Sequence, residues 1–114
     1  MTTFLCIAKH TPQNCPMFNA QSGKVYYDWF AKMPEISQKY GIKILASCTV
    51  VSEHLSTMIF EAPNLEVLQR ALMEPEFFAV SKVDTFEIKP ALGTEEAMKL
   101  FQQQFQQQRI PITA

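Results

Sequence analysis

Alternating apolar and polar positions predict four β-strands in this chain. Residues 4–10 alternate with a period of two, which is typical of a half-buried strand. The segments 42–51 and 55–61 are rich in β-branched and small apolar residues, and only three residues separate them. This spacing predicts a β-hairpin. Residues 83–89 alternate again and predict a fourth strand.

Apolar residues spaced three or four apart predict two helices between these strands. The first covers residues 24–40 and ends at Gly41, because glycine readily adopts the left-handed conformation that closes a helix. Pro34 lies inside it and predicts a kink or two shorter helices, since proline removes a backbone donor. The second covers residues 65–73, with Asn64 as its N-cap.

Further elements are predicted beyond the second helix. Residues 77–80 predict a short packed turn before the last strand. Thr94 precedes two acidic residues, as an N-cap does, and predicts a C-terminal helix over about 94–108. Its Phe101 and Phe105 are four positions apart and give this helix one apolar side. The tail is residues 109–114.

The order of elements predicts the fold class. Strand, helix, strand, strand, helix and strand form the split βαβ arrangement, in which helices cover one face of an antiparallel sheet. The chain is therefore expected to be α+β, with a ferredoxin-like βαββαβ core at about 3–90 and an extra C-terminal helix. Its 114 residues fit a single domain, 1–114.

In length, order of elements and added C-terminal helix, the chain resembles the dimeric α/β-barrel superfamily and its small uncharacterised members. The resemblance covers nearly the whole chain. It implies a homodimer whose sheets pair face to face, with a pocket between sheet and helices or inside the barrel. Many small proteins of this type act as isomerases, cofactor-independent monooxygenases or haem-handling proteins, so the resemblance leaves an enzyme open.

Composition indicates which classes of binding partner and which cellular compartment are expected. Ten basic and 11 acidic residues give a net charge of −1, which argues against nucleic acid or an anionic membrane as partner. No apolar run reaches the ~18 residues of a membrane span. The three cysteines are odd in number and widely spaced, which favours reduced thiols and a cytoplasmic protein. With three glycines and no glycine-rich loop, a nucleotide site is disfavoured.

The hairpin allows the two sheet faces to be assigned. A two-residue turn at Ser52 and Glu53 places Val51 opposite His54. The face expected to pack on the helices then comprises Ile42, Ile44, Ala46, Cys48, Val50, Leu55, Thr57 and Ile59. The other, half-polar face is expected to carry Phe4, Cys6, Ala8 and His10 together with Thr85 and Glu87. A three-residue turn would exchange the two faces.

Two histidines and a cysteine are the leading candidate site. His10 ends the first strand and His54 starts the third, and these strands are adjacent and antiparallel in the predicted fold, so the two rings should meet at one sheet edge. Cys15, in the following proline-framed loop, is the natural third ligand. Imidazole and thiolate bind zinc, copper, iron or nickel. Alternatively, the three residues are structural: His10 caps the strand end through a backbone hydrogen bond, His54 lies in an exposed turn, and Cys15 is a small packed residue.

Two other functions remain open from the sequence. Glu87, placed near Cys6, could act as a general base, with His10 or His54 as the acid, in a metal-free enzyme such as an isomerase or monooxygenase. A solvent-exposed Glu87 is the simpler interpretation. A ligand sensor or assembly module would instead depend on the side of the last helix that carries Phe101 and Phe105.

Overall fold

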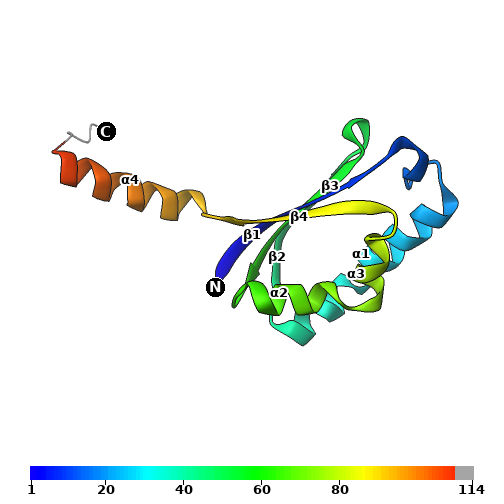
Figure 1. Ribbon diagram of the computed structural model, residues 1–114. Helices are drawn as coiled ribbons and strands as arrows, with labels where there is room; N and C mark the ends of the chain where they lie inside the picture. Colours follow the sequence, from blue (N-terminus) through cyan, green and yellow to red (C-terminus); the bar gives the residue numbers. More distant parts are fainter. Residues whose placement is uncertain (110–114) are drawn as a thin grey trace.

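Four antiparallel strands form one sheet in the order β2-β3-β1-β4 (Figure 1). The computed structural model describes residues 1–109; the end of the predicted tail, 110–114, lies outside them. The strands are β1 (Thr2–His10), β2 (Lys43–Val50), β3 (Leu55–Ala62) and β4 (Asp84–Ala91). This sheet confirms the predicted α+β ferredoxin-like fold.

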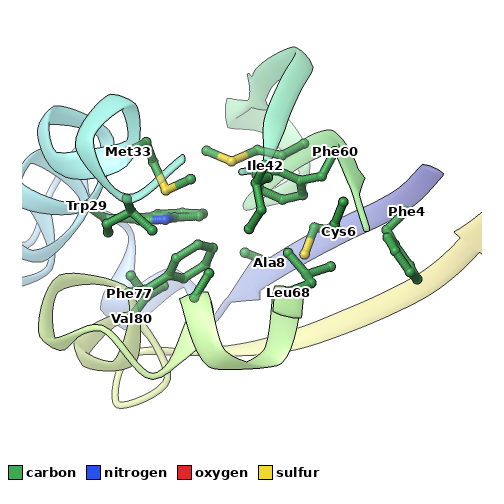
Figure 2. Close-up of a cluster of buried hydrophobic side chains, with 14 of the residues drawn as sticks. Phe4, Cys6, Ala8, Trp29, Met33, Ile42, Phe60, Leu68, Phe77 and Val80 are labelled. Atoms are coloured by element: carbon green, nitrogen blue, oxygen red, sulfur yellow. The ribbon is translucent and has the colours of Figure 1, made fainter. Parts of the chain in front are cut away.

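Helices α1 (Ala20–Tyr40), α2 (Leu65–Leu72) and α3 (Pro75–Val80) lie on one side of the sheet, and α4 (Thr94–Gln108) extends away from it (Figure 1). The packed helices enclose an apolar core rich in aromatic rings. Trp29 of α1 and Phe77 of α3 have ring centroids 5.1 Å apart. Both are buried against the sheet together with Leu68 of α2 (Figure 2).

The face that packs on the helices is largely the opposite of the predicted one. Phe4, Cys6 and Ala8 of β1 are buried in the core, and Met58 and Phe60 of β3 join them. Thr49 pairs with Ser56 and Ser47 with Met58, as a turn with Val51 opposite His54 implies, so in this part of the hairpin the assignment of the faces was wrong rather than the register. Both faces of β3 carry large apolar residues, and only the position of the helices decides which one is covered.

A β-bulge in β2 places residues that were predicted to share one face on opposite faces of the sheet. The register shifts between Ile44 and Ala46, so Leu45 has no partner of its own. Ile42 and Ile44 face the core as predicted, but Ala46, Cys48 and Val50 lie on the uncovered side. An extra residue in one strand reverses the alternation beyond it, and alternation alone does not locate such a residue.

The hairpin loop is longer than predicted. Val50 pairs with Leu55, which leaves four residues, Val51 to His54, between the strands instead of the predicted two-residue turn. The first three form a 3-10 turn, and His54 adopts the left-handed conformation with φ 53°. The loop therefore projects the His54 side chain from a specific, uncommon backbone conformation.

Helix boundaries agree with the sequence pattern more closely than sheet faces do. Helix α1 starts at Ala20, four residues before the predicted start, because Asn19 caps it, and it is one continuous helix through Pro34, so the alternative of two shorter helices was wrong. Gly41 closes it at φ 64°, as predicted. Asn64 caps α2 by accepting a hydrogen bond from the Val67 N–H at 2.9 Å. This confirms the predicted N-cap.

Two further boundaries differ from the prediction. Residues 75–80 form the short helix α3 instead of a packed turn, since Pro75 suits the first helical position. Gly93, not Thr94, occupies the N-cap position of α4, and no side chain caps that end. Thr94 is already the first helical residue.

Candidate functional site

Three segments meet where β1 ends. His10 is the last residue of β1, Cys15 follows the 3-10 turn Pro12–Asn14, and His54 closes the hairpin loop between β2 and β3. The His10 backbone N–H donates to the His54 carbonyl at 3.0 Å, which joins the loop to the strand end. The antiparallel pairing of β1 and β3 thus brings residues 44 positions apart side by side.

The predicted His10, Cys15 and His54 do come together. Their potential ligand atoms, one per residue, all lie within 4.8 Å of one another. The two imidazole rings meet edge to face, with centroids 5.3 Å apart and an interplanar angle of 77°. Cys15 is buried and forms no disulfide, so its sulfur is available as a ligand. Two nitrogens and one sulfur therefore converge from three separate segments.

Backbone hydrogen bonds fix the loop that carries Cys15. The Cys15 N–H donates to the Pro12 carbonyl at 3.3 Å, and its own carbonyl accepts from the Asn19 N–H at 2.8 Å. The Asn14 side-chain amide donates to the Val83 carbonyl at 3.3 Å, which ties the loop to the segment before β4. Cys15 is thus held from both sides rather than carried on a free loop.

Two ring nitrogens at this site lack partners. Among residues 1–109, His10 Nε2 and His54 Nδ1 are buried and form no hydrogen bond. An unpaired buried polar atom costs free energy, so native proteins usually satisfy it with a side chain, water or ion. His54 also adopts a left-handed conformation, and backbone strain of this kind is enriched at functional sites. Both features point to a ligand at this corner.

A tyrosine and an aspartate form a hydrogen-bonded sequence with His10. Tyr26 of α1 lies with its hydroxyl 3.2 Å from His10 Nδ1, and that hydroxyl donates its proton to the Asp84 carboxylate of β4. A tyrosine hydroxyl has one proton to donate, so it accepts from Nδ1–H of His10. This arrangement assigns the neutral tautomer of His10 with a free lone pair on Nε2.

The buried environment shifts the pKa values of this chain of groups. Burial, and then the neighbouring His54, hold the pKa of His10 below its ordinary value. Burial raises the pKa of Asp84 to about 6, although the hydrogen bond from Tyr26 acts in the opposite direction. Burial and the Asp84 carboxylate raise the pKa of Tyr26 above its ordinary value. His10 is therefore kept neutral, which is the form that binds metals.

A hollow of about 370 Å³ opens beside these groups. It is bounded by the end of β1 and the start of β4, and its lining residues are Lys9, His10, Thr11, Lys82, Val83, Asp84 and Thr85. Two lysines on its rim would favour an anionic molecule. Of the three candidate ligands, only His10 lines the hollow, and Asp84 lies beside it.

Glu87 does not belong to this site. It pairs with Ile7 across the β1 and β4 ladder and lies on the uncovered face, whereas His10 and Cys6 lie on the helix side. Its nearest ionic partner is Lys89, at 3.5 Å, and both side chains are largely exposed. The predicted placement of Glu87 on the same face as Cys6 was wrong, because Cys6 pairs with Ile88 and Glu87 pairs with Ile7, so the alignment of β4 with β1 differs by one residue from the predicted one. The solvent-exposed interpretation agrees with this position.

Sequence reasoning missed Tyr26 and Asp84 as supporting residues. Asp84 pairs directly with His10 in the register of β1 and β4, so a correct register would have identified it. Tyr26 had no such signal, because its position in an aromatic helix face is equally typical of a core residue.

Comparisons with known proteins identify the fold. No family model matches the chain, and no curated protein matches it. Among solved structures, an antibiotic biosynthesis monooxygenase is similar over 82% of this chain and 99% of its own, with 11% identity and a TM-score of 0.56. An uncharacterized NIPSNAP domain protein from Burkholderia xenovorans is similar over 82% and 95%, with 10% identity and a TM-score of 0.54.

These similarities confirm the resemblance at the level of fold. The chain has a ferredoxin-like fold, with a four-stranded antiparallel sheet and helices on one of its faces. Because identity is only 10–11%, the two structures show the fold and not the activity of this chain. Within residues 1–109, none of the helices combines the length and the apolar character needed to cross a membrane.

Proposed function

We propose that this protein binds a transition metal ion through His10, Cys15 and His54. The observation that carries the proposal is the convergence of their ligand atoms within 4.8 Å of one another. Two imidazoles and one thiolate suit zinc, copper, iron or nickel, and zinc fits best because it accepts this ligand set without a preferred geometry of its own. The two unpartnered imidazole nitrogens then acquire a partner.

The spacing of the ligand atoms is compatible with a modest closure around an ion. Bond lengths of about 2.0–2.3 Å in a tetrahedral zinc site separate the ligand atoms by about 3.3–3.6 Å. Separations of up to 4.8 Å must therefore shrink by about 1 Å. Rotation of the two imidazoles and the Cys15 side chain supplies such a movement without displacing the strands.

Tyr26 and Asp84 prepare His10 for this role. By accepting a hydrogen bond from Nδ1–H, Tyr26 leaves the free lone pair on Nε2, and Asp84 orients the hydroxyl. Partners of this kind fix the tautomer and orientation of a metal-binding histidine, and their loss usually weakens metal binding about 10–100-fold.

Three protein ligands leave one position of a tetrahedral ion free for water or a small molecule. A bound metal supplies Lewis acidity or redox chemistry at that position. The neighbouring hollow, with Lys9 and Lys82 on its rim, would admit an anionic molecule to it. A compartment that keeps thiols reduced, such as the cytoplasm, would preserve Cys15 as a ligand.

Elemental analysis of tag-free protein by plasma mass spectrometry tests this proposal. We expect near-stoichiometric metal in the wild type and a sharp loss in His10→Ala, Cys15→Ser and His54→Ala. Cys48→Ser is the matched control, because Cys48 is an exposed thiol on β2 outside the site. Unchanged metal content in both histidine variants, or no metal after reconstitution, would overturn the proposal.

A metal-free enzyme is the second candidate function. The observation that favours it is the hydrogen-bonded sequence His10, Tyr26 and Asp84, which could accept and hold a proton from an organic molecule in the hollow. The similarity to an antibiotic biosynthesis monooxygenase makes such chemistry worth assaying. This candidate requires turnover that resists chelators and is lost in Tyr26→Phe; turnover abolished by chelation would reject it.

We also propose that the protein is a homodimer whose uncovered sheet faces meet, as its resemblance implies. Leu5, Ile7 and Ile59 lie on that face and are only half-buried. Light scattering tests this proposal, and a monomeric mass at micromolar concentration would overturn it.

A further inference from the structure

Helix α4 projects from the molecule without packing on its own chain. It follows β4 after only Leu92 and Gly93 and extends beyond the sheet (Figure 1). Among residues 1–109, no side-chain hydrogen bond or ion pair joins it to any other element. A 15-residue helix is marginal in water without tertiary contacts. Something must therefore cover one of its sides.

The side in need of cover is defined by the sequence of α4. Ala97, Phe101 and Phe105 follow one another at four-residue intervals, with Met98 beside them, so they form one stripe. Phe101 is 54% and Met98 53% exposed. The opposite side is polar and consists mainly of glutamines, with Glu95 and Lys99.

A hollow that could receive this stripe lies on the uncovered sheet face. Its volume is about 530 Å³, and its floor is formed by Leu5, Leu45 and Ile59 from three adjacent strands. The remaining lining comes from Thr3, Glu61 and residues 91–96. The hollow thus lies where β4 passes into α4, beside the first turn of that helix.

The chain is too extended for a compact monomer of its length. Its radius of gyration is 17.5 Å, whereas a compact chain of this length has about 13 Å. It exposes 7802 Å², compared with about 6,300 Å² for a compact protein of its mass. The excess is of the size that one protomer contributes to a large homodimer interface, for which both protomers together bury about 2,000–5,000 Å².

We propose that α4 of each copy packs its Phe101 side into this hollow on a second copy. The exchange is reciprocal, as a two-fold axis requires, and covers both apolar surfaces at once. It rests on the homodimer proposed above, but not on the metal site. The half of the open face beyond the hollow, around Ile7 and Leu55, stays free for contact between the two sheets.

Other occupants fit less well. The α4 helix cannot place Phe101 in its own hollow, because its first turn forms part of the rim and Phe101 follows Gly93 by about 12 Å along the helix. An anionic membrane is disfavoured because, among residues 94–108, only Lys99 is basic, whereas helices that lie on membranes carry many basic residues.

Sedimentation equilibrium of full-length variants tests the role of the stripe. In Phe101→Glu/Phe105→Glu we expect a dimer dissociation constant raised at least 100-fold and an unchanged metal content. The matched control is Gln103→Glu/Gln106→Glu, which adds the same charge to the opposite side of α4 and should leave dissociation unchanged. A wild-type monomer would overturn the dimer itself. A wild-type dimer insensitive to the phenylalanine substitutions would overturn only the exchange of α4.

Isotope-filtered NMR then identifies the surface that α4 contacts. In a dimer mixed from labelled and unlabelled protomers, we expect cross-peaks between Phe101 and Phe105 rings of one copy and the methyl groups of Leu5, Leu45 and Ile59 of the other. Cross-peaks to these methyls seen only within one uniformly labelled copy would show that α4 folds back on its own sheet. Cross-peaks to other residues alone would place α4 elsewhere. Either result would overturn the proposal.

Discussion

The two faces of the sheet differ although they are made by the same strands. On the helix side, Phe4, Cys6 and Met58 are each at most 3% exposed and belong to one core. On the other side, Leu5 and Ile59 are only half-buried and lie beside charged residues. The comparison indicates that the helix-covered face supplies most of the stability of the single chain. The uncovered face retains apolar surface for association, and the candidate metal site lies at the end of the covered one.

The largest test of this comparison is a pair of substitutions on α1. Trp29→Ala should lower the free energy of unfolding by about 3–5 kcal/mol, because it removes the largest fully buried ring of the core. Tyr27→Ala, two residues earlier and 72% exposed, should change it by about 0.5 kcal/mol or less. Urea unfolding of both variants checks this, and similar losses would contradict a core confined to the helix side.

Neighbouring residues of β3 compare the two faces directly. Met58→Ala should cost about 2–5 kcal/mol, since Met58 lies in the core. Ile59→Ala should cost clearly less in dilute protein, because Ile59 faces away from the helices and is only half-buried. Its cost should grow with protein concentration if the open faces associate. Thermal unfolding at two concentrations measures both effects; a larger loss for Ile59→Ala in dilute protein would reverse the comparison.

A smaller, pH-dependent effect is expected from Asp84. Its pKa is raised to about 6 from an ordinary 3.8, so its contribution to stability is present below about pH 3.8 and is lost as pH rises through 6. Wild-type protein should therefore lose stability relative to Asp84→Asn between pH 4 and 6, with a constant difference above 7. Urea unfolding across this range, with a chelator present, measures the difference. A difference that does not vary with pH would contradict the raised pKa.

The smallest effect is expected at Glu87, three residues further along β4 and on the uncovered face. Glu87→Gln should change the free energy of unfolding by about 0.5 kcal/mol or less, because its ion pair with Lys89 is exposed. Metal content should also stay unchanged, since Glu87 lies on the opposite face from His10. Unfolding and elemental analysis of this variant provide the check. Loss of metal would place Glu87 in the site after all.

Local signals in the sequence were sufficient for the elements and for part of the candidate site. The alternation in residues 4–10, the glycine at 41 and the Asn64 cap each depend on neighbours within a few positions, and all three agree with the structure. His10 and His54 were also predictable, because antiparallel pairing of the first and third strands places their ends together. Tyr26 was not, because its role depends on how α1 lies across the sheet, and Asp84 was missed because its pairing with His10 depends on the register of β1 and β4.

The sequence by itself determined the order of elements, the antiparallel arrangement of neighbouring strands and the meeting of His10, Cys15 and His54. Only the tertiary structure decided which face of the sheet the helices cover. Leu55, Thr57 and Ile59 differ too little in hydrophobicity from Ser56, Met58 and Phe60 to settle that choice locally. The bulge at Leu45 then reverses the alternation of β2. Which face of the sheet is covered is a property of the packed layers. The burial of a side chain depends on what lies opposite it as well as on the side chain itself.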